Sequence, residues 1–258
     1  MSRGHGTKDF WLTALRADGS AFLAAVSEPG QLGTPVPSCP DWTIGELTRH
    51  LGAVYRRVRL NAGSGAADEP WGPVVVPDET PAAGDEQVVS WFANELAQID
   101  AFLDALDPDV PTWNWAPQAK RAAFWHRRMA HETAVHRWDA QFSTRLPEPL
   151  ESKLAADTVD EALDTFLPAG RRRPHADVTG LVQLIASDVG HEWYVRMRGD
   201  GIIALLDTGT LLDDDAHPAR AAAIGTASDL ALAIWGRISF EVLDTAGDEA
   251  LLEALRVA

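Results

Sequence analysis

The sequence has a single cysteine, Cys39, in 258 residues, so no disulfide can form within the chain. It has no run of about 18 apolar residues that would span a bilayer. Residues 1–7 at the N-terminus contain no hydrophobic core of a signal peptide. We therefore expect a cytoplasmic protein.

Basic residues are also scarce, because 22 Lys and Arg stand against 38 Asp and Glu, which gives a net charge of −16. Nucleic-acid phosphates and anionic membrane surfaces both require Lys and Arg, so neither nucleic acid nor a membrane is expected as a partner. The sequence contains no G-x-G-x-x-G, Walker loop, G-x-S-x-G or C-x-x-C motif. Nucleotide, flavin and serine-hydrolase functions therefore have no support.

Apolar residues make up 46% of the chain and include ten tryptophans, which is enough for one large or two small packed domains. A segment rich in Gly, Pro and Asp, 62–83, is expected to be a loop that could act as a lid. Helical periodicity dominates the first two-thirds of the chain and predicts helices over residues 10–26, 44–61, 85–106, 118–142 and 150–167.

The pattern changes after the Pro- and Arg-rich residues 168–174. A helix is predicted over 229–235, capped by Ser228, and a last helix over 248–256. Short strands are predicted over 181–185, 192–198, 201–206, 220–224 and 240–243. We therefore predict an α+β protein with a helical domain over 1–168 and a smaller α/β domain over 175–258.

The fourth predicted helix carries Glu132 and His136. Residues on a helix advance by about 100° each, so these two side chains, four positions apart, lie on one stripe. His131 and His136 are five apart and point about 140° away from each other, unlike the two histidines of a zinc-protease H-E-x-x-H motif. The spacing favours Glu132 and His136 as two metal ligands, although an ordinary exposed pair has the same spacing.

A third ligand must come from another element, and His50 is the best candidate. Thr43 and Glu46 form a T-x-x-E capping-box pattern that predicts the start of the second helix. His50 then lies about two turns into that helix, beside its apolar stripe. One Glu and two His with an open position is the composition of a catalytic zinc site. The alternative is that the three are unrelated polar residues.

Two neighbours of this trio have two interpretations each. Asp139 could accept the second imidazole N–H of His136, or it could form a surface salt bridge with an arginine. Arg128 could anchor a substrate carboxylate or pair with Glu132. For Cys39, a nucleophilic role needs a depressed pKa and a nearby base, so a buried structural thiol is the expectation.

Three segments resemble a known family. Residues 37–52, P-S-C-P-D-W-T-I-G-E-L-T-R-H-L-G, resemble the V-P-x-C-P-x-W-x-V-x-x-L-x-x-H-L-G segment of the mycothiol-dependent maleylpyruvate isomerase family, within the DinB-like metal-binding superfamily. Residues 127–140, R-R-M-A-H-E-T-A-V-H-R-W-D-A, are similar to its R-R-x-x-H-E-x-x-x-H-R-x-D segment. Residues 225–237, G-T-A-S-D-L-A-L-A-I-W-G-R, resemble its second-domain signature G-T-A-x-D-L-x-L-x-x-W-G-R.

The resemblance implies an N-terminal DinB-like four-helix bundle that binds a divalent metal, usually Zn²⁺, through His50, Glu132 and His136. It implies a smaller C-terminal α/β domain, similar to sterol-carrier folds, that closes over the site. Arg237 matches the arginine expected to contact an anionic substrate. The implied thiol co-substrate is mycothiol, the thiol of actinobacteria. The acidic segment 211–218 departs from the family and leaves the charge of the pocket open.

Together these features predict a metal- and thiol-dependent isomerase or S-transferase for a small electrophilic, anionic substrate. A metal-dependent hydrolase that uses bound water is one alternative. A non-catalytic metal-binding stress or binding module is another. The protein is expected to be a monomer or a homodimer.

Overall fold

The computed structural model describes residues 6–77, 79–170, 178–199, 203–206 and 219–257. The chain forms two compact units, Met1–Glu148 and Pro149–Ala258. The sequence placed the boundary later, near residues 168–175. The structure assigns helix α5 (Ser152–Glu161) to the second unit instead, where it packs on helix α6 (Ala227–Ile234). Hydrophobic periodicity identifies a helix but not the partner that covers its apolar face.

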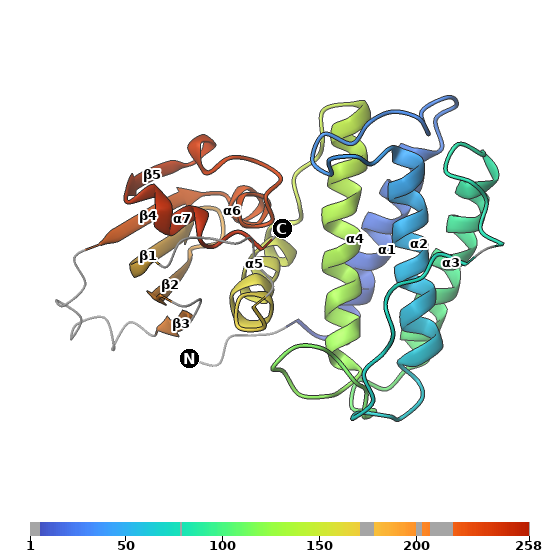
Figure 1. Cartoon of the computed structure of the whole chain (residues 1–258), viewed down its shortest axis with the longest axis horizontal. Helices are drawn as coiled ribbons and strands as arrows, with labels where there is room; N and C mark the ends of the chain where they lie inside the picture. Colours follow the sequence, from blue (N-terminus) through green and yellow to red (C-terminus); the bar gives the residue numbers. More distant parts are fainter. Residues whose placement is uncertain (1–5, 78, 171–177, 200–202, 207–218, 258) are drawn as a thin grey trace. The chain divides into compact units, whose positions relative to one another are not determined.

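The first unit consists of four long helices (Figure 1), α1 (Lys8–Val26), α2 (Ile44–Asn61), α3 (Gln87–Ala105) and α4 (Ala123–Thr144). Helix α1 packs on α4, and α2 packs on α3. The predicted capping box is present, since the Thr43 hydroxyl accepts from Glu46 N while the Glu46 carboxylate accepts from Thr43 N. The start and end of α2 agree with the sequence prediction, because a local cap fixes its first residue.

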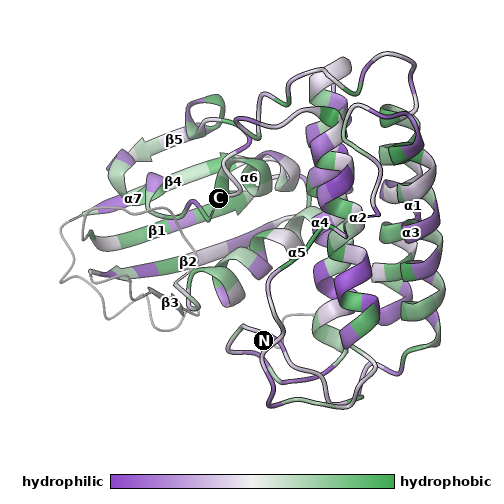
Figure 2. Cartoon of the chain, turned by 45° about the vertical axis from the view of Figure 1, so that its right-hand side comes forward, coloured by the Kyte–Doolittle hydropathy of each residue, from purple (hydrophilic) through white to green (hydrophobic). Residues whose placement is uncertain are grey.

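Apolar side chains from all four helices fill the interior of the bundle, including Leu15, Phe22, Tyr55, Phe92 and Met129. Helix α4 differs from the other three, because its polar residues are buried too. Hydrophilic stretches run along this helix (Figure 2), and they include buried Arg128, Arg137 and Asp139. Buried charged groups need partners or ligands, so α4 is the candidate location of a functional site.

The second unit is built on a five-stranded mixed sheet with the strand order β3-β2-β1-β4-β5. The central strand β1 runs parallel to β4, and the other neighbouring pairs are antiparallel. Its strands are β1 (Thr179–Ala186), β2 (His191–Arg198), β3 (Ile203–Leu206), β4 (Arg220–Gly225) and β5 (Asp244–Gly247). Along β1, Val182, Leu184 and Ala186 are buried, and α6 and α7 (Glu249–Glu253) pack against this strand.

Three local predictions in this unit were wrong. Helix α6 is capped by Thr226, whose hydroxyl accepts from Asp229 N, rather than by Ser228. Residues 240–243 are not a strand, because Phe240–Val242 form a short 3-10 turn and the strand is β5 directly after it. The last helix is shorter than predicted, and Asp248 is its N-cap.

The predicted α+β class is confirmed, with a helical region followed by a small mixed-sheet domain. A single π-helical turn, Ala162–Phe166, continues α5. Parts of three predictions, namely 171–174 of the linker, 201–202 of a strand and the acidic segment 211–218, lie outside the described residues. Over the part of the chain that is described, no helix combines the length and apolar character needed to cross a membrane.

Candidate metal centre

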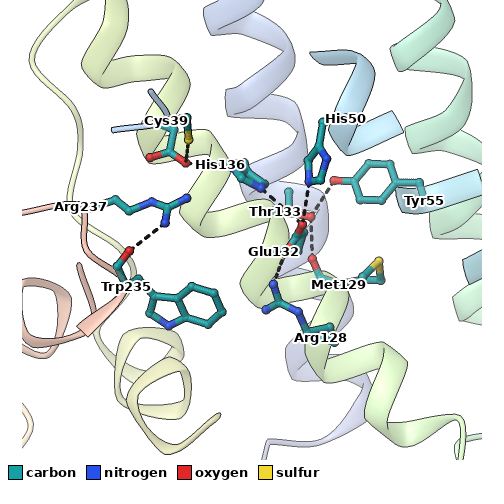
Figure 3. Close-up of polar contacts among 11 residues, drawn as sticks. Cys39, His50, Tyr55, Arg128, Met129, Glu132, Thr133, His136, Trp235 and Arg237 are labelled. Atoms are coloured by element: carbon teal, nitrogen blue, oxygen red, sulfur yellow. Dashed lines mark hydrogen bonds and ion pairs between the residues drawn. The ribbon is translucent and has the colours of Figure 1, made fainter. Parts of the chain in front are cut away.

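The structure brings His50 from α2 together with Glu132 and His136 from α4. His50 Nε2 lies 3.3 Å from Glu132 Oε1, and His136 Nε2 lies 3.4 Å from the same oxygen. Figure 3 shows the two rings and the carboxylate directed at one another. The helical spacing predicted from sequence therefore places Glu132 and His136 on one stripe, and the packing of α2 on α4 adds His50.

The distances fit a small divalent cation. Zinc binds nitrogen and oxygen ligands at about 2.0–2.1 Å, so neighbouring donors in a tetrahedral site lie about 3.3–3.4 Å apart. The two distances to Glu132 Oε1, 3.3 and 3.4 Å, have this length. One ligand atom from each of the three residues lies within 4.8 Å of the other two. The donor set of two imidazoles and one carboxylate also suits zinc.

Arg128 determines which oxygen of Glu132 faces the histidines. Its Nη2 forms an ion pair with Glu132 Oε2, one turn along α4, so Oε1 is the oxygen that meets both imidazoles. The sequence suggested that Arg128 either anchors a substrate carboxylate or pairs with Glu132, and the structure contains the pair with Glu132. This pair is compatible with the trio because it uses the other oxygen.

The site is buried on its α4 side and more open at α2. Side-chain exposure is 9% for His136 and 12% for Glu132 but 29% for His50. Trp42, which immediately precedes the capping box of α2, covers the two imidazoles. Its ring centroid lies 4.7 Å from that of His50 and 6.5 Å from that of His136. An aromatic wall beside a polar cluster is typical of small-molecule sites.

Burial and local charges set the protonation of Glu132 and His136. Burial by itself would raise the pKa of Glu132, but Arg128, His136 and His50 outweigh it and lower that pKa well below its ordinary value. Burial would lower the pKa of His136, but hydrogen bonds with Asp139, Cys39 and Glu132 raise it well above its ordinary value. The protein's own groups thus favour an anionic carboxylate beside an imidazolium. A divalent cation would replace the proton on His136 Nε2.

Asp139 takes the other nitrogen of His136. The imidazole Nδ1–H donates to Asp139 Oδ2 at 2.9 Å, and the aspartate is fully buried. From sequence alone, Asp139 could also have formed a salt bridge on the surface. Because Asp139 is fully buried, it is not at the surface. A carboxylate bound to the far nitrogen fixes the tautomer of a metal-binding histidine and directs Nε2 at the ion.

A series of two hydrogen bonds also joins α2 and α4 close to the trio. Thr133 Oγ1 donates to the Met129 carbonyl at 2.6 Å, so the Tyr55 hydroxyl is the donor in its own 2.6 Å bond to Thr133 Oγ1. These contacts are drawn in Figure 3. Because Tyr55 is fully buried, this series holds α2 at a fixed distance from α4, close to His50 and Glu132.

Cys39 and Ser38 lie beside Asp139, which the sequence did not foresee. Cys39 Sγ is 3.5 Å from Asp139 Oδ2, and Ser38 Oγ donates to Asp139 Oδ1 at 2.6 Å. Cys39 is half-buried rather than a fully buried structural thiol. Cys39, His136 and Asp139 also bring one potential ligand atom each within 4.8 Å. The sequence signals were their position directly ahead of the α2 capping box and the match of Cys39 to the Cys of the V-P-x-C-P segment.

Arg237 lies in the second unit, at the end of α6. Gly236 has a φ of 71°, and Arg237 N donates to the Leu232 carbonyl at 2.8 Å while Gly236 N donates to the Ala233 carbonyl. This is a Schellman helix end, which needs the left-handed conformation that glycine adopts readily. The guanidinium donates to the Trp235 carbonyl (Figure 3) and is partly exposed. Its contact with a substrate stays a prediction.

The remaining histidines of α4 belong to the core. His126 is buried, and its two ring nitrogens lie 2.9 Å from the Ala122 and Leu103 carbonyls. His131 is fully buried and is not part of the trio.

Comparisons with known proteins give the family. The model of the mycothiol maleylpyruvate isomerase N-terminal domain matches residues 12–141, and the model of the C-terminal domain of that family matches residues 153–254. Among solved structures, the chain is similar to the crystal structure of the mycothiol-dependent maleylpyruvate isomerase and to that of a point mutant of it. Each similarity covers 93% of both chains with a TM-score of 0.62 and 12% identity. A comparison with curated protein sequences gave no match.

Proposed function

Because the chain belongs to the mycothiol-dependent maleylpyruvate isomerase family, we propose that it is a metal-binding, thiol-dependent enzyme. Its reaction is isomerisation of, or thiol transfer to, a small electrophilic substrate that carries a negative charge. The observation that carries this proposal is the convergence of His50, Glu132 and His136 on one point.

We propose Zn²⁺ as the metal and mycothiol as the thiol. His50 Nε2, Glu132 Oε1 and His136 Nε2 would hold the ion and leave a fourth position open. When bound, the ion would lower the pKa of a thiol in that position, so that a thiolate is available at neutral pH. A cytoplasmic location suits such a co-substrate, because small thiols are kept reduced there.

The chain's own residues prepare the site for this chemistry. Asp139 holds His136 in one orientation, and Arg128 holds Glu132 with Oε1 inward. Trp42 provides an apolar wall beside the imidazoles. We assign recognition of the substrate's negative charge to Arg237, because a guanidinium binds a carboxylate through two parallel hydrogen bonds.

In the isomerase reaction, the thiolate sulfur adds to an electron-poor carbon of a cis alkene. The π electrons move into the conjugated carbonyl, and the former double bond rotates as a single bond. Elimination re-forms the alkene as the trans isomer and returns the thiolate. In a transferase, the same adduct takes up a proton and leaves with the sulfur attached. The two reactions therefore differ in whether thiol is consumed.

The test is to incubate the zinc-loaded protein with mycothiol and small cis-enoic keto acids, and to measure product and free thiol together. Trans product with constant free thiol identifies an isomerase, and a stoichiometric loss of thiol identifies a transferase. Turnover without any thiol would replace the proposal with the metal-dependent hydrolase. If neither turnover nor thiol binding occurs, the protein is a non-catalytic metal-binding module.

A further inference from the structure

The loop before α2 reaches the metal-binding helix through two side chains, Ser38 and Cys39. We infer that both are positioning residues, which hold the Asp139 carboxylate and through it the imidazole of His136. This inference rests on the proposed role of His136 as a metal ligand. It gives the lone cysteine a hydrogen-bonding role instead of a chemical one.

The contacts to Asp139 use both of its oxygens. Ser38 Oγ–H donates to Oδ1 at 2.6 Å, which is the short distance of a hydroxyl bound to a carboxylate. Oδ2 accepts the His136 Nδ1–H at 2.9 Å and has Cys39 Sγ at 3.5 Å. The aspartate has no exposed surface. A buried carboxylate depends on its donors, so removing Ser38 or Cys39 should loosen its orientation.

The loop that carries the two residues is held by its own backbone. Val36 N donates to the Trp42 carbonyl at 2.8 Å, Cys39 N to the Val36 carbonyl at 3.0 Å and Trp42 N to the Cys39 carbonyl at 3.1 Å. Asp41 has a φ of 70°, a left-handed conformation that aspartate tolerates within turns. Ser38 and Cys39 therefore present their side chains from a fixed turn and not from a loose loop.

This turn leads directly into the helix that carries His50. Thr43, the N-cap of α2, follows it at once. One rigid segment therefore sets the start of α2 and, through Ser38 and Cys39, the side chain of Asp139 on α4. The two metal-binding imidazoles come from elements distant in the sequence, and this segment connects both of them.

The position of Cys39 favours a donor over a ligand or a nucleophile. Its sulfur lies 3.5 Å from Asp139 Oδ2, the oxygen that also accepts the Nδ1–H of His136, and it shares a further hydrogen bond with His136 itself. Glu132 meets the same ring on the Nε2 side, and His50 meets the same Glu132 oxygen. The two ring nitrogens point in different directions, and Cys39 groups with His136 and Asp139 whereas the trio is a separate group of His50, Glu132 and His136. A hydroxyl in place of the thiol can make the same hydrogen bond.

The experiment compares the variants Ser38→Ala, Ser38→Thr, Cys39→Ala and Cys39→Ser. Zinc affinity is measured by competition with a chromophoric chelator, and exchange of the His136 Nδ1–H is measured by NMR without added metal. Ser38→Ala should weaken zinc binding about tenfold, the lower end for partners of metal ligands, and should speed up the exchange. Ser38→Thr and Cys39→Ser, which keep a donor, should resemble the wild type. Cys39→Ala should fall between them, because a thiol is a weak donor.

Ser143→Ala is a matched control. The Ser143 hydroxyl donates to the backbone carbonyl of the same Asp139 at 2.9 Å and leaves the carboxylate untouched, so zinc affinity should not change. Wild-type affinity and exchange in Ser38→Ala would overturn the role of Ser38. A loss in Cys39→Ser as large as in Cys39→Ala would overturn the donor role of Cys39 and indicate a need for sulfur. None of these measurements uses turnover, so the inference can hold even if thiol-dependent catalysis is absent.

Discussion

The guanidinium of Arg128 pairs with one oxygen of Glu132 and leaves the other oxygen to the two histidines. A single carboxylate thus serves both as the partner of a buried cation and as a candidate ligand. Each function uses a different oxygen, so neither displaces the other. The charge of Arg128 also lowers the pKa of Glu132, which keeps the carboxylate ionised and ready to bind a metal.

Removal of any member of the trio should release the metal without unfolding the bundle. We expect His50→Ala, Glu132→Ala and His136→Ala each to lose most bound zinc, because two ligands do not hold the ion. The helical circular dichroism should stay close to that of the wild type. His191→Ala, in the second unit, is the control and should keep its zinc. Elemental analysis of the purified variants checks this, and stoichiometric zinc in Glu132→Ala would refute the ligand assignment.

Substitution of Arg237 should affect substrate binding and not metal binding. We expect Arg237→Met to raise KM for an anionic substrate about tenfold or more, because one charge-assisted bidentate contact is lost. Arg237→Lys should restore part of the affinity, since it keeps the charge but not the planar geometry. Steady-state kinetics checks this beside zinc analysis. An unchanged KM in Arg237→Met would remove this residue from substrate recognition.

A methyl group at Gly45 should disturb the start of α2. A Cβ at this position would lie 1.8 Å from the Ala83 carbonyl oxygen, which is a backbone atom and cannot rotate away. We expect Gly45→Ala to lower the free energy of unfolding by about 1–3 kcal/mol, the usual cost of overpacking. Urea denaturation of Gly45→Ala and of Gly33→Ala tests this. A Cβ at Gly33 meets nothing within 4 Å, so Gly33→Ala is the control. Equal free energies of unfolding for the two variants would contradict the close approach of Gly45 to the Ala83 carbonyl.

The two tyrosines should make the protein lose stability at alkaline pH. Burial raises the pKa of Tyr55 well above its ordinary value, and a hydrogen bond to Glu192 raises that of Tyr194. A group whose folded pKa is raised contributes stability that is fully present below its unfolded pKa, about 10, and is lost as the pH rises further. The free energy of unfolding should therefore fall above about pH 10.

In the variant Tyr194→Phe, a spectroscopic pH titration reports on Tyr55 alone, because Tyr55 is then the only tyrosine in the sequence. In that variant the tyrosinate absorbance should appear only when the protein unfolds. Tyr55→Phe should remove most of the alkaline loss at a cost of about 1 kcal/mol at neutral pH, for one hydrogen bond. Tyrosinate formation in folded Tyr194→Phe near pH 10 would show that Tyr55 is not held as the structure has it.

Features that depend on neighbours along the chain were predictable. The capping box of Thr43 and Glu46 is local, so the start of α2 was correct. The spacing of Glu132 and His136 follows from helical geometry alone, and their side chains do meet. The cap of α6 was missed because Thr226 and Ser228 are both good caps. Thr226 accepts from Asp229 N, whereas Ser228 is buried and accepts from Leu150 N.

The sequence by itself determined that the first unit has four long helices, and it determined the stripe that carries Glu132 and His136, because side-chain periodicity within one element decides both. The order of helical and strand patterns along the chain also gave the α+β class. Only the tertiary structure decided that Oε1 of Glu132 faces His50, that Asp139 is buried with Ser38 and Cys39 around it, and that α5 joins the second unit. Ser38 and Asp139 are 101 residues apart. No local preference encodes such a contact, since it exists only when two elements pack and a buried charge requires a donor.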